Sequence, residues 1–258
     1  MPPAMKLHLL PVRTAGAAEN MAVDFLLLQR YPGPPAPRFR HYAWRGPAFT
    51  FGFSQKIAFV RAALAADLPC DLCRRPTGGG IVDHRNDWTY SLVLPRGLPL
   101  YDEPAPRSYR VIHECLTATL VALGQPAVVK MQCEPESSCG SELARDSGDL
   151  SRASSLPQVG PGVCFQRAEL YDVVNSRTGA KIAGAAQKRN KHGLLFQGSI
   201  EKSSVAPLDW ADFQERFTAA LAQVLGVEAA VTPWPELHED EVSGLIEQYS
   251  APEWIEYR

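Results

Sequence analysis

The amino-acid sequence predicts an α+β fold, in which helices flank a mixed or antiparallel β-sheet. Segments typical of strands follow one another in runs, and helical segments interrupt those runs irregularly. Short turns containing Asn and Gly separate the last three strand-like segments, as expected for an antiparallel meander. A doubly wound parallel sheet would instead require strands and helices to alternate along the chain.

The first half of the chain contains five segments with a clear secondary-structure pattern. A helix is expected where Met21 and Phe25 recur on one face. The Gly46-Pro47 turn separates two strands, and three consecutive glycines separate two more. A longer amphipathic helix stops at Gly124. We therefore expect a helix, a strand pair, a short helix, a second strand pair and a helix at residues 18–30, 37–53, 57–66, 70–94 and 107–123.

The second half begins with a segment of different composition. Residues 133–162 are rich in Ser, Gly, Pro and charged residues, which is typical of an exposed, flexible insertion. We expect this insertion to interrupt a single domain spanning residues 1–258 rather than to separate two domains. Beyond it, three strands of a meander and then two helices are predicted at residues 169–175, 180–187, 194–200, 209–225 and 238–248.

The overall composition excludes several classes of function. The 258 residues carry a net charge of −2, far from the basic excess of proteins that bind nucleic acid. No apolar run approaches the roughly 20 residues of a transmembrane helix, and residues 1–10 lack the pattern of a signal peptide. We therefore expect a cytoplasmic protein with no membrane or nucleic-acid partner, whose six cysteines are mostly free thiols.

The densest candidate site surrounds the three consecutive glycines. Such a run loses much backbone entropy on folding, which is justified where a ligand lies directly on the main chain. Two neighbouring arginines are suited to bind phosphate or carboxylate. A flexible hairpin turn explains the glycines equally well, and neither a dinucleotide-binding fingerprint nor a P-loop is present. The candidate ligand-binding residues are Arg74, Arg75, Thr77, Gly78, Gly79, Gly80 and His84.

Two further candidates lie in the second half of the chain. Lys181 stands in a strand with the small residues Gly184, Ala185 and Ala186, which leave open space above the sheet. Its ammonium group could hold a carbonyl oxygen, whereas a lone strand lysine more often faces solvent. Cys164 lies at the edge of the insertion, where it could act as a thiolate nucleophile, although a free cysteine is more often a small buried hydrophobe.

Five blocks of sequence, taken together and in order, carry a family resemblance. They are Asn20-Met21-Ala22-x-Asp24, Tyr42-x-Trp44-x-x-Pro47 with Phe51-Gly52-Phe53-x-Gln55, the glycine motif R-R-x-T-G-G-G-x-V-x-H followed by D-W-T-Y-S, Lys181-Ile182-x-Gly184-x-Ala186-Gln187-x-Arg189, and Gly198-Ser199-Ile200. The chain resembles the superfamily of biotin and lipoate protein ligases and lipoyl (octanoyl) transferases. The resemblance covers most of the chain, and the glycine motif is its most specific part.

The resemblance implies a fold, further site residues and an activity. The fold is that of the class II biotin/lipoate ligase-like catalytic domain. Cys164-Phe165 is similar to a pair in one octanoyltransferase branch, whose cysteine carries the acyl group as a thioester. The D-W-T-Y-S block is similar to the E-L-T-Y-S ending of that branch. The resemblance also adds Tyr90, Gly198 and Ser199 to the substrate-binding candidates.

In that branch, an acyl carrier protein would present an octanoyl thioester to the Cys164 thiolate. A lysine of a lipoyl domain or of the glycine-cleavage H protein would then attack the acyl-enzyme. Lys181 would hold the acyl carbonyl oxygen. Burying about seven methylenes at ~0.8 kcal/mol each would contribute roughly 5–6 kcal/mol of binding free energy. The resemblance to this branch implies no cofactor and no metal.

Two alternatives remain open. In an ATP-dependent lipoate ligase, which uses ATP and Mg, the two arginines of the glycine motif and Lys181 would contact phosphate, and Cys164 would be incidental. A non-catalytic homologue would bind lipoyl domains without any chemistry. The G-R-G-R-x-G signature of biotin ligases is absent, and Gln197 stands where the family often has His.

Spacing raises two further points. In a simple hairpin Lys181 would lie opposite about Val173, nine residues after Cys164. An extended chain would place those residues up to roughly 30 Å apart at ~3.3 Å per residue, so the segment 162–168 must curl back over the sheet.

Cys70 and Cys73 have the spacing of a metal or redox pair, but residues three apart on a strand face opposite sides and no second pair follows.

Overall fold

The computed structural model describes residues 5–30, 35–64, 69–132 and 168–257, so the predicted insertion at 133–162 and Cys164 lie outside the described residues. The strands are β1 (Lys6–Ala15), β2 (Arg38–Trp44), β3 (Ala48–Phe51), β4 (Asp71–Arg74), β5 (Ile81–Asp83), β6 (Asp87–Pro95), β7 (Ala127–Val129), β8 (Val173–Asn175), β9 (Lys181–Asn190), β10 (Gly193–Glu201) and β11 (Glu228–Val231). The helices are α1 (Ala17–Gln29), α2 (Ile57–Ala63), α3 (Pro99–Asp102), α4 (Ala105–Ala122), α5 (Trp210–Leu225), α6 (Glu239–Ser250) and α7 (Pro252–Ile255).

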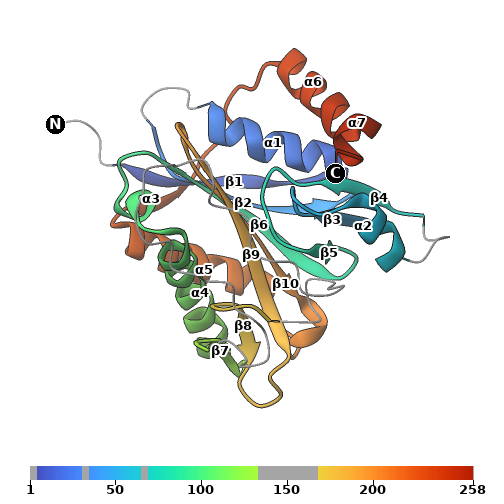
Figure 1. Cartoon of the computed structure of the whole chain (residues 1–258). Coiled ribbons are helices and arrows are strands. Elements are labelled where there is room, and N and C mark those ends of the chain that lie inside the picture. The colour runs from blue at the N-terminus through green and yellow to red at the C-terminus, as the bar shows by residue number, and fades with distance from the viewer. Residues whose placement is uncertain (1–4, 31–34, 65–68, 133–167, 258) are drawn as a thin grey trace, which may run out of the picture.

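The strands form two sheets. Eight strands make a mixed sheet in the order β11-β1-β2-β6-β10-β9-β8-β7, and β4-β3-β5 make a smaller one. In the larger sheet β1 runs parallel to β11 and β2, whereas all other neighbours are antiparallel. Helices α4 and α5 cover one face of this sheet, and α1, with α6 beside it, covers the other (Figure 1). The predicted α+β class with a mixed sheet and flanking helices is confirmed.

Side-chain alternation along β6 divides the hydrophobic core between the two faces of the sheet. Trp88 and Tyr90 point toward α5, where they pack with Phe213 and Phe217 in one aromatic cluster. Val93 belongs to a separate cluster formed with residues of α1. Because both faces are covered, every residue of β6 is buried. This strand therefore forms the centre of the molecule.

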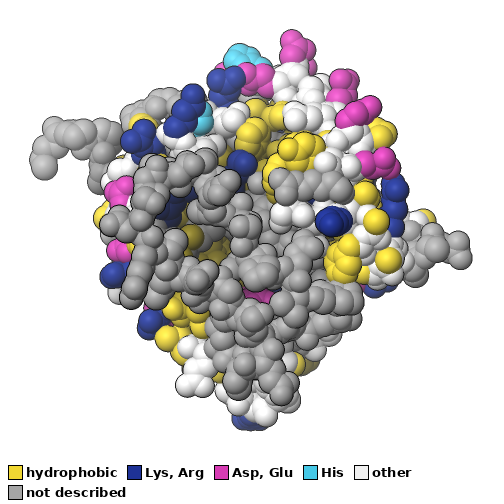
Figure 2. Space-filling model, viewed as in Figure 1, with side chains coloured by type: hydrophobic (Ala, Val, Ile, Leu, Met, Phe, Trp, Pro, Cys, Tyr) yellow, Lys and Arg dark blue, Asp and Glu magenta, His cyan; other side chains and the backbone are white. Residues whose placement is uncertain are grey.

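The predicted helix ends have identifiable causes. Asp209 caps α5 by accepting hydrogen bonds from two main-chain amides, and Gly226 ends it in a left-handed conformation with φ 67°. The first turn of α6 contains Glu239, Asp240 and Glu241, which favour a helix N-terminus. Acidic side chains gather over α6 and α7 at the upper right of Figure 2. No helix in the described ranges is long and apolar enough to cross a membrane.

Several details differ from the prediction. The segment 70–94 contains three strands rather than two, because the chain turns again between β5 and β6. The two strands predicted within 37–53 belong to different sheets. The strand predicted at 169–175 begins only at Val173, because the left-handed backbone of Tyr171 interrupts it. Lys181 pairs with Val174 rather than Val173.

Candidate functional site

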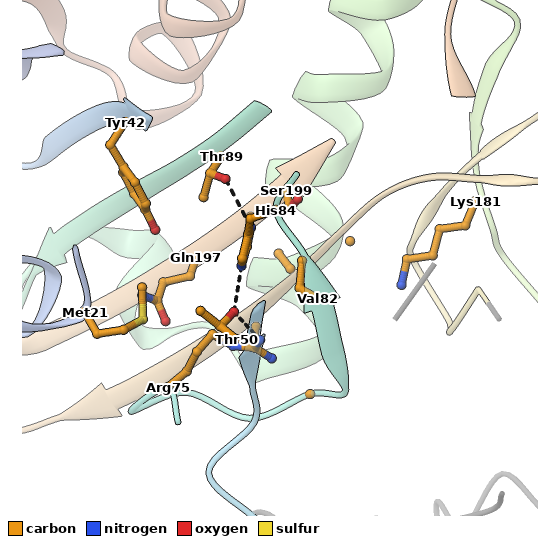
Figure 3. A pocket seen from close by; sticks show the side chains of 15 residues that line it. Met21, Tyr42, Thr50, Arg75, Val82, His84, Thr89, Lys181, Gln197 and Ser199 are labelled. Atoms are coloured by element: carbon orange, nitrogen blue, oxygen red, sulfur yellow. Dashed lines mark hydrogen bonds between the residues drawn. The ribbon is translucent and has the colours of Figure 1, made fainter. Parts of the chain in front are cut away.

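A cavity lies between the two sheets. The smaller sheet and the glycine segment form one wall, strands of the larger sheet form the other, and α1 contributes one side chain. Figure 3 shows Lys181 apart from the remaining side chains, with Met21 and Tyr42 on the far side of the group. The lining residues are Met21, Tyr42, Thr50, Arg75, Gly79, Val82, His84, Thr89, Lys181, Gly184, Ala185, Ala186, Gln197, Gly198 and Ser199.

Glycines keep the wall of the larger sheet thin. A Cβ atom at Gly198 would lie 2.3 Å from the ring of Tyr90, which packs beneath it on the core side. A Cβ atom at Gly184 would lie 2.7 Å from the side chain of Lys181. Both distances are shorter than van der Waals contact, so a side chain at either position requires its neighbours to move. Tyr90, predicted to bind substrate, therefore supports the wall from behind and does not line the cavity.

Arg74 has a different place from the one predicted. Its guanidinium group is fully buried and donates hydrogen bonds to the carbonyl oxygens of Phe53, Gln55, Trp254 and Ile255 at 2.7–2.9 Å. Arg74 is absent from the cavity lining. The structure thus places this predicted ligand-binding residue where it ties α7 to the segment that follows β3.

Arg75 does line the cavity, but its guanidinium group is also engaged. It donates to Thr50 Oγ1 at 2.8 Å and to the carbonyl oxygens of Gly78 and Gly80 at 2.8 and 2.9 Å. Of the three glycines, only Gly79 lines the cavity, with φ +90°. Arg75 therefore fixes the shape of the glycine segment from within, because it binds the carbonyls on either side of Gly79.

His84 links the wall of the smaller sheet to the larger one. Its Nε2 lies 2.7 Å from Thr50 Oγ1, and its Nδ1 lies 2.7 Å from Asp87 Oδ2 (Figure 3 shows the first pair). With a neutral ring, Nδ1–H donates to Asp87 while Thr50 donates to Nε2. Burial raises the pKa of Asp87, but the contact with His84 and hydroxyl hydrogen bonds outweigh it and hold that pKa below its ordinary value.

Gln197 occupies the position where the family often has His, and a buried network fixes its amide. The amide nitrogen donates to Asp24 Oδ2 at 2.7 Å, and the amide oxygen accepts from Thr77 Oγ1 at 2.7 Å. Asp24 also accepts from Arg40 and Ser91. Thr77 does not line the cavity itself but contacts the lining residue Gln197. The two ends of the amide are distinguishable because one partner is a carboxylate and the other a hydroxyl.

Lys181 lies at the edge of the cavity with its side chain almost fully buried. The residue is 6% exposed, so the alternative of a solvent-facing lysine is wrong. Its Nζ lies 2.6 Å from Asp172 Oδ2. An ammonium group held in this way beside a slot of small residues can stabilise negative charge on a carbonyl oxygen. Cys164, the predicted nucleophile, lies outside the described residues, so its distance from Lys181 stays untested.

Sequence reasoning placed some of these residues correctly in space and missed others. Gly184, Ala185, Ala186, Gly198 and Ser199 line the cavity, although their role in substrate binding stays a prediction. Thr50, Asp87 and Asp172 were not singled out as functional. Asp87 is the first residue of the D-W-T-Y-S block, and this position was the only feature of the sequence that indicated a role for it in the site.

Cysteines of the described ranges have structural surroundings. Cys73 and Cys115 are buried, and Cys70 is partly exposed. Burial raises the pKa of the Cys115 thiol to about 11, which disfavours the thiolate. Among the described residues, no group of His, Cys, Asp and Glu side chains is arranged to hold a metal ion.

Comparisons with known proteins agree on one family. Residues 16–205 match the family described as the lipoyl protein ligase A/B catalytic domain. Octanoyltransferase LipM of Exiguobacterium sp. is 32% identical over 200 residues, which cover 76% of this chain and 66% of that protein. Octanoyltransferase LipM of Symbiobacterium thermophilum is 26% identical, covering 92% and 93%. A bi-partite lipoate protein ligase from Thermoplasma acidophilum shares the fold, with TM-score 0.67 at 16% identity over 98% of both chains.

Proposed function

Because the chain belongs to the lipoyl protein ligase A/B catalytic-domain family, we propose that it is an octanoyltransferase of protein lipoylation. The donor is an octanoyl-acyl carrier protein, and the acceptor is a lysine of a lipoyl domain or of the glycine-cleavage H protein. One observation carries the proposal beyond the family: the Lys181 ammonium borders a slot walled largely by small and apolar residues. Such a slot suits an acyl chain whose carbonyl oxygen is held at one end.

Cys164 is the proposed nucleophile of the first step. Its thiolate attacks the carbonyl carbon of the donor thioester and forms a new C–S bond. The bond between that carbon and the carrier sulfur then breaks, and the carrier leaves as a thiolate. Lys181 stabilises the negative charge that develops on the carbonyl oxygen between these two events.

The second step transfers the acyl group to the acceptor. The neutral amine of the acceptor lysine attacks the carbonyl carbon of the Cys164 thioester, an amide bond forms, and the amine releases one proton to solvent. The C–S bond breaks and regenerates the Cys164 thiolate. The donor is a thioester of similar energy to the intermediate, so the reaction needs no ATP and no other cofactor.

The arginines favour this transferase over the ligase alternative. A ligase that forms an acyl-adenylate requires cations to bind the nucleotide phosphate. Arg74 and Arg75 donate instead to main-chain carbonyls of the protein. A phosphate at this place would have to displace those partners.

Intact-mass analysis with octanoyl-acyl carrier protein, in the absence of ATP, tests the proposal. We expect the added mass of one octanoyl group, its loss in Cys164→Ser, and its retention in the matched control Cys70→Ser, which changes a partly exposed thiol. Subsequent addition of a lipoyl domain should move the octanoyl group onto that domain. Modification that requires ATP and lipoate and survives Cys164→Ser would establish a ligase. Absence of any modification under both conditions would contradict both enzyme activities and favour the non-catalytic homologue.

A further inference from the structure

The Lys181 ammonium contacts a buried chain of polar groups, Asp172 and Tyr109, that lies outside the five sequence blocks. Lys181 Nζ lies 2.6 Å from Asp172 Oδ2, and the two side chains are only 3% and 1% exposed. The other carboxylate oxygen of Asp172 accepts a hydrogen bond from the Tyr109 hydroxyl at 2.5 Å. That hydroxyl in turn accepts from the main-chain amide of Ala185, a residue of the cavity wall, at 2.9 Å. Asp172 therefore connects Lys181 to the wall through Tyr109.

The backbone next to Asp172 adopts an unfavourable conformation. Tyr171 has φ 67°, and among the described residues no other non-glycine residue has positive φ. A left-handed backbone is disfavoured for an aromatic residue and persists only where its surroundings impose it. Here the Tyr171 amide donates to the carbonyl of Lys130, and the Lys130 amide donates to the carbonyl of Asp172, both at 2.8 Å. These two bonds bracket the left-handed residue.

His113 binds the main-chain carbonyl of Tyr171 in that turn. Its Nδ1 lies 2.6 Å from the carbonyl oxygen of Tyr171. A carbonyl only accepts, so Nδ1 carries the hydrogen. Burial lowers the pKa of His113 to about 4, which keeps the ring neutral and this donor unchanged near neutral pH. Tyr109 and His113 lie four residues apart on α4 and thus project from the same face of the helix.

We propose that Asp172 is a positioning residue for Lys181, and that α4 fixes Asp172 at two points: through Tyr109 at its carboxylate and through His113 at the left-handed Tyr171. In this arrangement the ammonium is held in place before an acyl group arrives, so no reorganisation is needed during the reaction. The inference rests on the proposed function only in assigning Lys181 to octanoyl transfer.

The first test measures the surroundings of Lys181 without any reaction. The chain is treated briefly with acetic anhydride at pH 8, and acetylation at Lys181 is compared with that at the exposed Lys191 by peptide mass analysis. In Asp172→Asn the ratio should rise at least ~5-fold, because a buried ammonium that loses its counter-ion gives up its proton more readily. The matched control Asp83→Asn removes the same charge from a more exposed ion pair with Arg85, and should leave the ratio unchanged.

The second test measures octanoyl transfer under single-turnover conditions. Asp172→Asn should slow transfer at least ~100-fold, and Tyr109→Phe about tenfold. The double variant should be no slower than Asp172→Asn alone, because Tyr109 acts through Asp172. Thermal unfolding of each variant shows whether it is folded. A purely structural role would instead make the two losses of rate multiply and follow the losses of stability.

These outcomes separate the inference from the proposed function. The positioning role is overturned if the acetylation ratio is unchanged in folded Asp172→Asn. It is also overturned if the rate loss of the double variant equals the product of the losses caused by Asp172→Asn and Tyr109→Phe. A raised ratio together with no octanoyl transfer by the unsubstituted chain overturns the proposed function but leaves the placement of Lys181 by Asp172 established. A raised ratio with non-multiplying rate losses supports both.

Discussion

Replacing Arg74 with Met should detach helix α7 rather than weaken substrate binding. The guanidinium group is fully buried and donates to two carbonyls after β3 and to two carbonyls of α7. A methionine side chain preserves much of the apolar stem but donates no hydrogen bond. All four carbonyls therefore lose a charged donor, and α7 loses both of its bonds to this arginine.

The expected loss of stability follows from these bonds. A hydrogen bond from a charged donor contributes about 1.5–3 kcal/mol. The α7 carbonyls regain water when that helix detaches, so only the two bonds to Phe53 and Gln55 are counted, which gives about 3–6 kcal/mol. In a chain of this size each kcal/mol lowers the melting temperature by roughly 2–4 °C, so we expect a decrease of at least ~6 °C.

Calorimetry, limited proteolysis and transfer kinetics together test this expectation. Arg74→Met should melt earlier, become sensitive to cleavage between α6 and α7, and keep the KM for the octanoyl donor of the unsubstituted chain. Arg61→Met is the matched control: it breaks an exposed ion pair with Glu256, next to α7, which is worth less than about 1 kcal/mol. If Arg74→Met melted within ~2 °C of the unsubstituted chain but raised KM tenfold, the structural role argued for Arg74 would be refuted.

Three other predictions concern the core and the turn before β8. Gly198→Ala should lower the free energy of unfolding in urea by about 1–3 kcal/mol, because its methyl group would lie 2.3 Å from the Tyr90 ring. The loss should shrink when Tyr90→Leu is added, and an undiminished loss would contradict this cause. Between pH 7 and pH 4 the chain should lose about 3 kcal/mol through His113, because the unfolded state binds a proton near pH 6.5 and the folded state only near pH 4. His113→Gln should therefore show a shallower pH dependence in the same titration. Tyr171→Asn should retain octanoyl transfer, since Asn tolerates a left-handed backbone, whereas Tyr171→Val should lose it; equal activities would show that the conformation is unimportant.

Local rules predicted the elements whose causes are local. The helix predicted at 209–225 is present, and in the structure Asp209 caps its start and Gly226 terminates it. The final meander follows from turns whose residues favour tight reversals. In contrast, β1 and β11 were not predicted, because each is stabilised by a parallel partner more than 200 residues away in the chain.

The motifs predicted where the candidate site lies, but not which side chains of each motif face it. Residues adjacent on a strand point to opposite sides, and this rule separates Arg74 from Arg75 and Tyr90 from Thr89. Resemblance to a motif includes both members of each pair, so it places core residues among the binding residues. Asp172 was missed for another reason: its position depends on the left-handed Tyr171, which no local pattern in the sequence indicates.

The two walls of the cavity differ in how the chain supplies them. The wall on the smaller sheet, from Thr50 to His84, comes from one continuous stretch, whereas the opposite wall is assembled from β2, β6, β9 and β10. A segment of about residues 46–85 could therefore be exchanged between relatives as a cassette, leaving the Lys181 side untouched. The hydrogen bonds from Thr77 to Gln197, from His84 to Asp87 and from Arg74 to α7 are among the junctions that such a chimera must match. Selectivity for the acyl chain would then be open to recombination as well as to single substitutions.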